Sequence, residues 1–226
     1  MNSTPRIRNT TGAITIVSGI MALACLLLSA MGANYNFDVF SNPVLILTIQ
    51  GVSVPLIRWS MITDLFGYYL LLLPAIFHLN DWMKPKTPWC NLLTFCGTSY
   101  VLLGAIGASI LAVVWPSLHS AFQTAMPVQQ EHLKLSFQMI SDLVYGGMWN
   151  LLEVLLGGVW WLGVGTILRG EQKVLGYVTI LLGFFTVLDG VGAVVEMKAL
   201  SEVGLNVYLI LAPVWAIWFG AALMKK

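Results

Sequence analysis

The chain has 226 residues, of which 58% are hydrophobic and 9% are charged, and its formal net charge is +1. A soluble domain carries about 25% charged residues, so this composition indicates a protein that is surrounded mostly by lipid. The small net charge creates no field that would attract nucleic acid, so no nucleic-acid partner is expected. No long charged run, flexible linker or low-complexity tract interrupts the sequence, so residues 1–226 are predicted to form one integral membrane domain.

Six apolar segments are long enough to cross a bilayer, which takes about 20 largely apolar residues in a helix. The sequence therefore predicts an all-α fold, a polytopic bundle of six transmembrane helices. The fourth segment is too long to lie entirely in hydrocarbon, so we expect that helix to tilt or to project from the membrane. The predicted spans are residues 11–33, 59–81, 91–115, 138–168, 174–195 and 205–223.

Basic residues are divided unequally between the two sides of the predicted bundle. With six spans both termini share a side, and the basic residues on that side clearly outnumber those on the other. Because lysine and arginine favour the cytoplasmic side, both termini are predicted to be cytoplasmic. The termini share their side with Arg6, Arg8, Lys84, Lys86, Arg169, Lys173, Lys225 and Lys226, while Arg58, Lys134 and Lys198 lie on the other. The loops on the outer side, residues 34–58 and 116–137, are long and are expected to be irregular.

A five-residue segment of the second span is echoed in the fourth span. Residues 61–65 read MITDL and residues 139–143 read MISDL. Both spans run from the outside inward, so Asp64 and Asp142 are expected at a similar depth in the outer leaflet. The echo is either a chance similarity between two apolar helices or the trace of a parallel internal repeat. The sequence reveals no pair of interrupted helices, the feature that transporters with internal repeats use.

The segment from Arg58 to Leu65, the apolar run after it and the basic turn Lys84-Pro85-Lys86 resemble a widespread family of uncharacterised bacterial six-helix membrane proteins. Members of that family share this length, a short basic N-terminus, an Arg-x5-Asp entry to the second helix and an aspartate near the start of the fourth. Asp142 would match that aspartate. The resemblance implies the fold and the topology and supplies no activity. The expected location is the bacterial inner membrane.

Acidic side chains in or beside the predicted spans are the strongest functional signal in the sequence. No lysine or arginine lies deep enough in the same helices to neutralise them. A charge in a bilayer costs several kcal/mol, so an intramembrane carboxylate is by default a site hypothesis. Three of them, Asp64, Asp142 and Asp189, are expected at a similar depth. At a rise of 1.5 Å per residue each lies roughly 6–10 Å below the outer boundary of the membrane, where the three could converge. The acidic residues are Asp64, Asp142, Glu153, Asp189 and Glu196.

Aromatic residues near these carboxylates predict a polar groove that descends from the outer surface to Glu153 near mid-membrane. Asp142 and Glu153 are eleven residues apart, which is three turns of an α-helix, so they are predicted to share a face. A structural role remains open for each aspartate, because Asp64 could pair with Arg58 and the others could cap helix ends. The candidate ligand-binding residues are Asp64, Asp142, Asp189, Glu153, Tyr68, Tyr145, Trp149 and Arg58.

Glu153 has no cation nearby in the sequence, and burial disfavours its charged form. It is therefore either neutral and hydrogen-bonded, to Asn150 or to a tyrosine of another helix, or part of a proton or cation path. No recognisable motif assigns metal binding or catalysis to other residues, because the three histidines are scattered and no HExxH or GxSxG is present. We predict no metal, no cofactor and no catalytic residue.

The leading interpretation is a protein that binds or transports a small or amphiphilic ligand, which would enter from the outer side. One alternative is a membrane-embedded enzyme acting on a lipid or isoprenoid substrate. Another is a non-catalytic assembly or sensor component, and the small-residue face around Gly104 and Gly107 could support a homo-oligomer or a membrane protein partner. Membrane lipids are the expected partners in every case.

Overall fold

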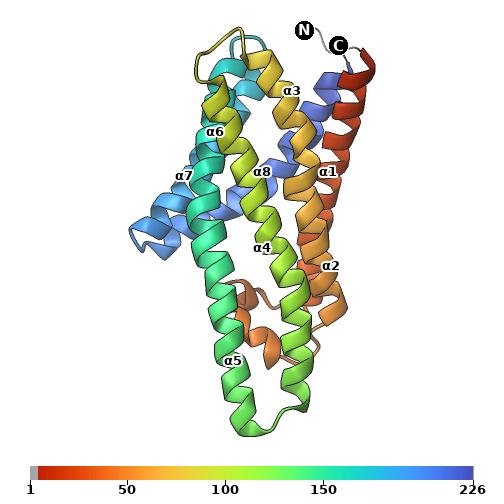
Figure 1. Cartoon of the computed structure of the whole chain (residues 1–226), viewed down its shortest axis with the longest axis vertical. Coiled ribbons are helices and arrows are strands. Elements are labelled where there is room, and N and C mark those ends of the chain that lie inside the picture. Colours follow the sequence, from red (N-terminus) through yellow and green to blue (C-terminus); the bar gives the residue numbers. More distant parts are fainter. Residues whose placement is uncertain (1–4, 226) are drawn as a thin grey trace.

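The computed structural model describes residues 5–225 and consists of long helices packed into an elongated bundle (Figure 1). Six helical runs are long and apolar enough to cross a membrane. The predicted all-helical bundle of six spans is therefore confirmed, and the chain is a multi-pass membrane protein. Helix α1 begins and helix α8 ends at the same end of the bundle, which we call the termini end. The opposite end is the far end, and Lys226 lies outside the described residues.

Four spans are single α-helices, namely α1 (Pro5–Gly32), α4 (Cys90–Thr124), α7 (Lys173–Val194) and α8 (Lys198–Met224). The second span is composite and consists of α2 (Val54–Asp64), the π-helix η3 (Leu65–Tyr69), the short 3₁₀-helix η4 (Leu70–Leu72) and α3 (Leu73–Met83). The fourth span consists of α5 (Pro127–Asp142), the π-helix η5 (Leu143–Glu153) and α6 (Val154–Leu168). Two 3₁₀-helices, η1 (Phe37–Phe40) and η2 (Pro43–Leu47), lie between α1 and α2.

Both composite spans change from α-helix to π-helix directly after the echoed segments. Helix α2 ends at Asp64 and η3 begins at Leu65, while α5 ends at Asp142 and η5 begins at Leu143. A π-helix forms i→i+5 hydrogen bonds. It is rare in proteins overall, and where it occurs it is often at a functional site. Both spans therefore change helix type at the echo, which the sequence does not reveal, and the echo coincides with a repeated structural feature.

The far ends of α4 and α5 form a hairpin that extends past the connection between α7 and α8 (Figure 1). The fourth span has 42 residues, which at 1.5 Å per residue is about 63 Å, roughly twice the thickness of the hydrocarbon core. This span therefore projects from the membrane. Residues 116–137 are largely helical, so the prediction of an irregular loop there is wrong. Pro127 starts α5 because the first turn of a helix needs no N–H donor there.

Four aromatic side chains fill the bundle interior on the termini side of its centre. Trp160, Trp161, Trp215 and Phe219 are each at most 2% exposed. The ring centroids of Trp161 and Trp215 are 4.5 Å apart, and those of Trp215 and Phe219 are 4.8 Å apart. We call these four residues the aromatic block. Because aromatic rings are large and apolar, this part of the interior is unfavourable for water and ions.

Candidate functional site

Asp64 ends α2 in the interior of the bundle, where its side chain is 8% exposed. Its Oδ1 atom is 4.0 Å from the Sγ atom of Cys25 on α1, and its Oδ2 atom has no hydrogen-bond partner among residues 5–225. Arg58, the salt-bridge partner considered from the sequence, is exposed, and neither residue takes part in the ion pairs described for that range. Asp64 is therefore a buried carboxyl group without a neutralising cation.

Glu153, the last residue of η5, is 2% exposed. Its Oε2 atom accepts a hydrogen bond of 3.2 Å from the hydroxyl of Tyr69 on η3, so the partner is a tyrosine of another helix. Asp64 and Asp189 each interact electrostatically with Glu153. Glu153 is therefore close to both aspartates.

Four buried tyrosines from η3, α4 and α8 form a hydroxyl-rich layer near Glu153. The Tyr100 hydroxyl donates to the Tyr68 carbonyl oxygen at 3.0 Å and lies 2.6 Å from the Tyr208 hydroxyl. The Tyr69 hydroxyl donates to Glu153, and the ring centroids of Tyr69 and Tyr100 are 5.7 Å apart. We call Tyr68, Tyr69, Tyr100 and Tyr208 the tyrosine layer. Tyr100 also stacks on Trp160, so this layer borders the aromatic block.

A small hollow lies on the far-end side of Asp64. Its volume is about 20 Å³, which is enough for about one water molecule. Ser60 and Met61, one turn before Asp64, form part of its wall, and η1 and η2 cover it. The lining residues are Ser29, Ala33, Val39, Phe40, Ile46, Ile57, Ser60, Met61, Trp115 and Tyr145. The polar interior is therefore bounded by a small, covered hollow on one side and by the aromatic block on the other.

Tyr145 and Trp149 lie on the inward side of η5, with ring centroids 5.0 Å apart. Tyr145 lines the hollow, stacks on Trp115 and interacts electrostatically with Asp64. The Trp149 Nε1 atom donates to the Gly104 carbonyl oxygen at 3.3 Å. Tyr145 therefore lies in the same region as Asp64, and Trp149 packs beside Tyr145.

Asp142 is exposed and lies outside this interior. The prediction that Asp142 and Glu153 share a face is wrong. The residues between them form a π-helix, in which each hydrogen bond spans one residue more than in an α-helix, so eleven residues no longer complete three turns. In the fourth span the buried polar residue of the echo is Ser141, which is 1% exposed and accepts a hydrogen bond of 3.1 Å from Trp115 Nε1.

Asp189 lies in α7 and is fully buried. Its Oδ1 atom accepts a hydrogen bond from the hydroxyl of Ser201 on α8, and its Oδ2 atom has no partner within residues 5–225. Of the three aspartates expected to converge, two therefore approach Glu153 and Asp142 does not.

Four residues of this interior were not predicted from the sequence, namely Tyr69, Tyr100, Tyr208 and Ser201. A usable signal for the tyrosines was their position, because tyrosine in a span is normally found at the membrane interfaces. Tyr69 and Tyr100 instead lie well inside their spans. Ser201 gave no such signal, because serine is unremarkable near the start of a helix.

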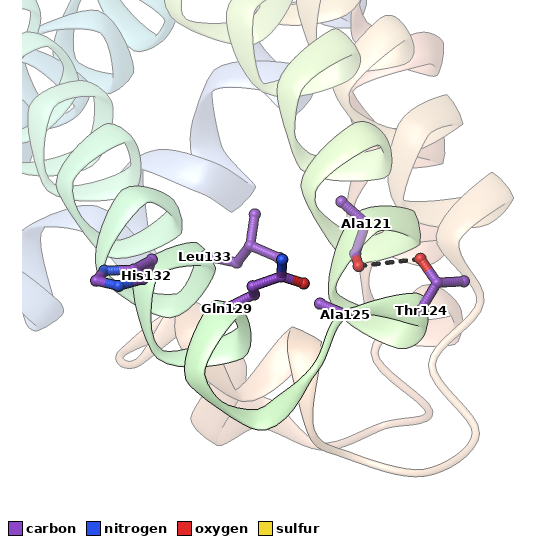
Figure 2. A pocket seen from close by; sticks show the side chains of 6 residues that line it. All are labelled: Ala121, Thr124, Ala125, Gln129, His132 and Leu133. Carbon is purple, nitrogen blue, oxygen red and sulfur yellow. Dashed lines mark hydrogen bonds between the residues drawn. The ribbon is translucent and has the colours of Figure 1, made fainter.

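A larger hollow of about 430 Å³ lies at the tip of the α4–α5 hairpin (Figure 2). It is lined by Ala121, Thr124, Ala125, Gln129, His132 and Leu133. The Thr124 hydroxyl donates to the Ala121 carbonyl oxygen at 3.2 Å. This hollow contains none of the candidate residues from the sequence. Among residues 5–225, no group of three or more His, Cys, Asp or Glu side chains is placed to hold a metal ion.

No family model, curated protein or solved structure matches the chain. The resemblance to the family of uncharacterised six-helix proteins therefore stays a prediction.

Proposed function

We propose that this chain is a membrane protein that binds or transports a small cation, and that the ligand its interior fits best is the proton. The observation that carries the proposal is the pair formed by Asp64 and Glu153. Both are buried in the bundle, they interact electrostatically, and no lysine or arginine within residues 5–225 pairs with either. A proton on each carboxylate removes the several kcal/mol that an unpaired intramembrane charge costs.

The hollow beside Asp64 favours a proton over the small or amphiphilic ligand expected from the sequence. Its volume of about 20 Å³ accommodates about one water molecule, so the tail of an amphiphile would not fit without movement of η1 and η2. The polar side chains in its wall are those of Ser29, Ser60 and Tyr145. These groups provide the hydrogen-bonding partners that a water molecule or a hydrated proton needs on its way to Asp64.

Proton exchange with the far end follows from the position of the aromatic block. The hollow lies between Asp64 and the far end, whereas the block closes the termini side. The π-helix η3 directly follows Asp64 and the π-helix η5 ends at Glu153, and π-helices are frequent at functional sites. With both termini cytoplasmic in the bacterial inner membrane, as the sequence predicts, the proton would enter from the outer side.

Infrared spectroscopy of the purified protein in lipid vesicles tests this proposal, because a protonated carboxyl group has a carbonyl band that a carboxylate lacks. Wild type at neutral pH is expected to show such bands. Asp64→Asn and Glu153→Gln should each remove one component. The matched control Asp142→Asn should remove none, because Asp142 is exposed.

A wild-type spectrum without protonated carboxyl bands at neutral pH would refute the proposal. Loss of the same component in the Asp142→Asn control would refute the assignment to Asp64. Circular dichroism of each variant shows whether its helices are intact.

A further inference from the structure

Asp189 is a third buried carboxylate, beyond the Asp64–Glu153 pair. It is 0% exposed, and its Oδ2 atom has no hydrogen-bond partner in residues 5–225. Its one described hydrogen bond comes from the Ser201 hydroxyl. As an anion it would keep a buried oxygen uncompensated, which is unfavourable in an apolar interior. As a neutral acid it would carry its proton on the unpartnered oxygen.

Close approach of α7 and α8 holds this hydrogen bond in place. A Cβ atom on Gly204 would lie 2.5 Å from the backbone nitrogen of Asp189, and one on Gly192 would lie 2.4 Å from that of Ser201. The two backbones therefore meet almost without intervening side chains, as small residues permit in membrane helices. This packing fixes Ser201 against Asp189.

Glu153 of η5 faces Asp189 from the fourth span. A Cβ atom on Gly190, next to Asp189, would lie 3.0 Å from a side-chain carbon of Val154, next to Glu153, and the two carboxyl groups interact electrostatically. From α6, the apolar side chains of Val154 and Leu155 cover the adjacent Gly190. From α8, Ser201 supplies a hydroxyl and no charge. Glu196 in the α7–α8 connection is exposed, as are Lys198 and Glu202 in the first turns of α8. Lys198 and Glu202 pair with each other at 3.7 Å.

We infer that Asp189 is a further proton-binding residue whose charge state is coupled to that of Glu153, an inference that rests on the proposed function of Asp64 and Glu153. Glu153 is close to both aspartates, so a charge on either one disfavours a charge on Glu153. Asp189 is five residues before the end of α7, about 7.5 Å along the helix. The interior therefore has two proton-binding positions toward the far end, one beneath η1 and η2 and one beneath the α7–α8 connection.

The test is an infrared pH titration of the full chain in lipid vesicles, with Asp189→Asn, Ser201→Ala and the control Ser109→Ala. Asp189→Asn should remove one carbonyl component and one step from the titration of the Glu153 component, because interacting acids titrate as a coupled set. Ser201→Ala should keep every component but shift that of Asp189, which loses its donor. Ser109 is exposed and donates within its own helix, so Ser109→Ala should leave the spectrum unchanged.

An unchanged spectrum in both Asp189→Asn and Ser201→Ala would overturn the inference, since Asp189 would then be ionised or uncoupled. If Asp189→Asn does not fold, Ser201→Ala alone decides, because it removes one hydroxyl and leaves the carboxyl group. Failure here remains distinct from failure of the proposed function. Loss of a component in Glu153→Gln would uphold the Asp64–Glu153 pair even where Asp189 shows no proton.

Discussion

In the second span the echoed segment places its aspartate inside the bundle, whereas in the fourth span the same segment places its aspartate outside. Asp64 is 8% exposed and Asp142 is exposed, although both directly precede a π-helix. Helix α2 packs against α1 and α4, which enclose Asp64, while α5 packs against α4 and η2 and leaves much of its surface free. The change from α-helix to π-helix therefore accompanies the local motif, whereas the neighbouring helices determine which side chain is buried.

The largest expected effect comes from the contact between α4 and the second span. A Cβ atom at Gly104 would lie 1.9 Å from a ring carbon of Tyr69, whereas one at Gly146 in η5 would meet no atom within 4 Å. Gly104→Ala should destabilise the protein by about 1–3 kcal/mol through overpacking. Gly146→Ala should be neutral or stabilise it by up to about 1 kcal/mol. Denaturant unfolding in micelles measures both, and equal effects would contradict the packing described.

A smaller effect is expected at the residues that precede the two aspartates. Ser141→Ala removes the acceptor of the Trp115 indole N–H, which is buried, and should cost about 1–2 kcal/mol. Thr63→Ala removes a hydroxyl that donates to carbonyl oxygens of its own helix and also contacts the Cys25 thiol. It leaves no buried indole N–H without an acceptor, so we expect a loss of less than about 1 kcal/mol. Thermal unfolding of the two variants compares the spans directly. If Thr63→Ala lost more stability than Ser141→Ala, the faces of the second and fourth spans described as buried would be wrong.

The smallest effect is expected at Asp142 itself. Asp142→Ala changes an exposed side chain with no described hydrogen bond or ion pair in residues 5–225, so the unfolding free energy should change by less than about 0.5 kcal/mol. The same unfolding assay measures it. A loss of several kcal/mol would mean that Asp142 is buried by a partner in the membrane, and the contrast with Asp64 would then disappear.

The six spans were predictable because each requires only a local run of apolar residues. The arrangement of the carboxylates was not, because it depends on contacts between residues far apart in sequence. Tyr69 and Glu153 are 84 positions apart, and Tyr100 and Tyr208 are 108 apart. The position of Asp142 was wrong for a different reason, since the α-helical period was applied across η5. Asp64 and Asp189 are both buried in the bundle, and their part in ligand binding stays a prediction.

The projecting α4–α5 hairpin is mechanically connected to the buried interior. Helix α5 has 16 residues and continues without a break into η5, the π-helix that ends at Glu153. At 1.5 Å per residue α5 is a lever about 24 Å long, so a bend of about 10° at its base would move its tip by about 4 Å. A force applied at the exposed tip, for example by an antibody fragment, would therefore be transmitted along one continuous helix toward the hydrogen bond between Glu153 and Tyr69.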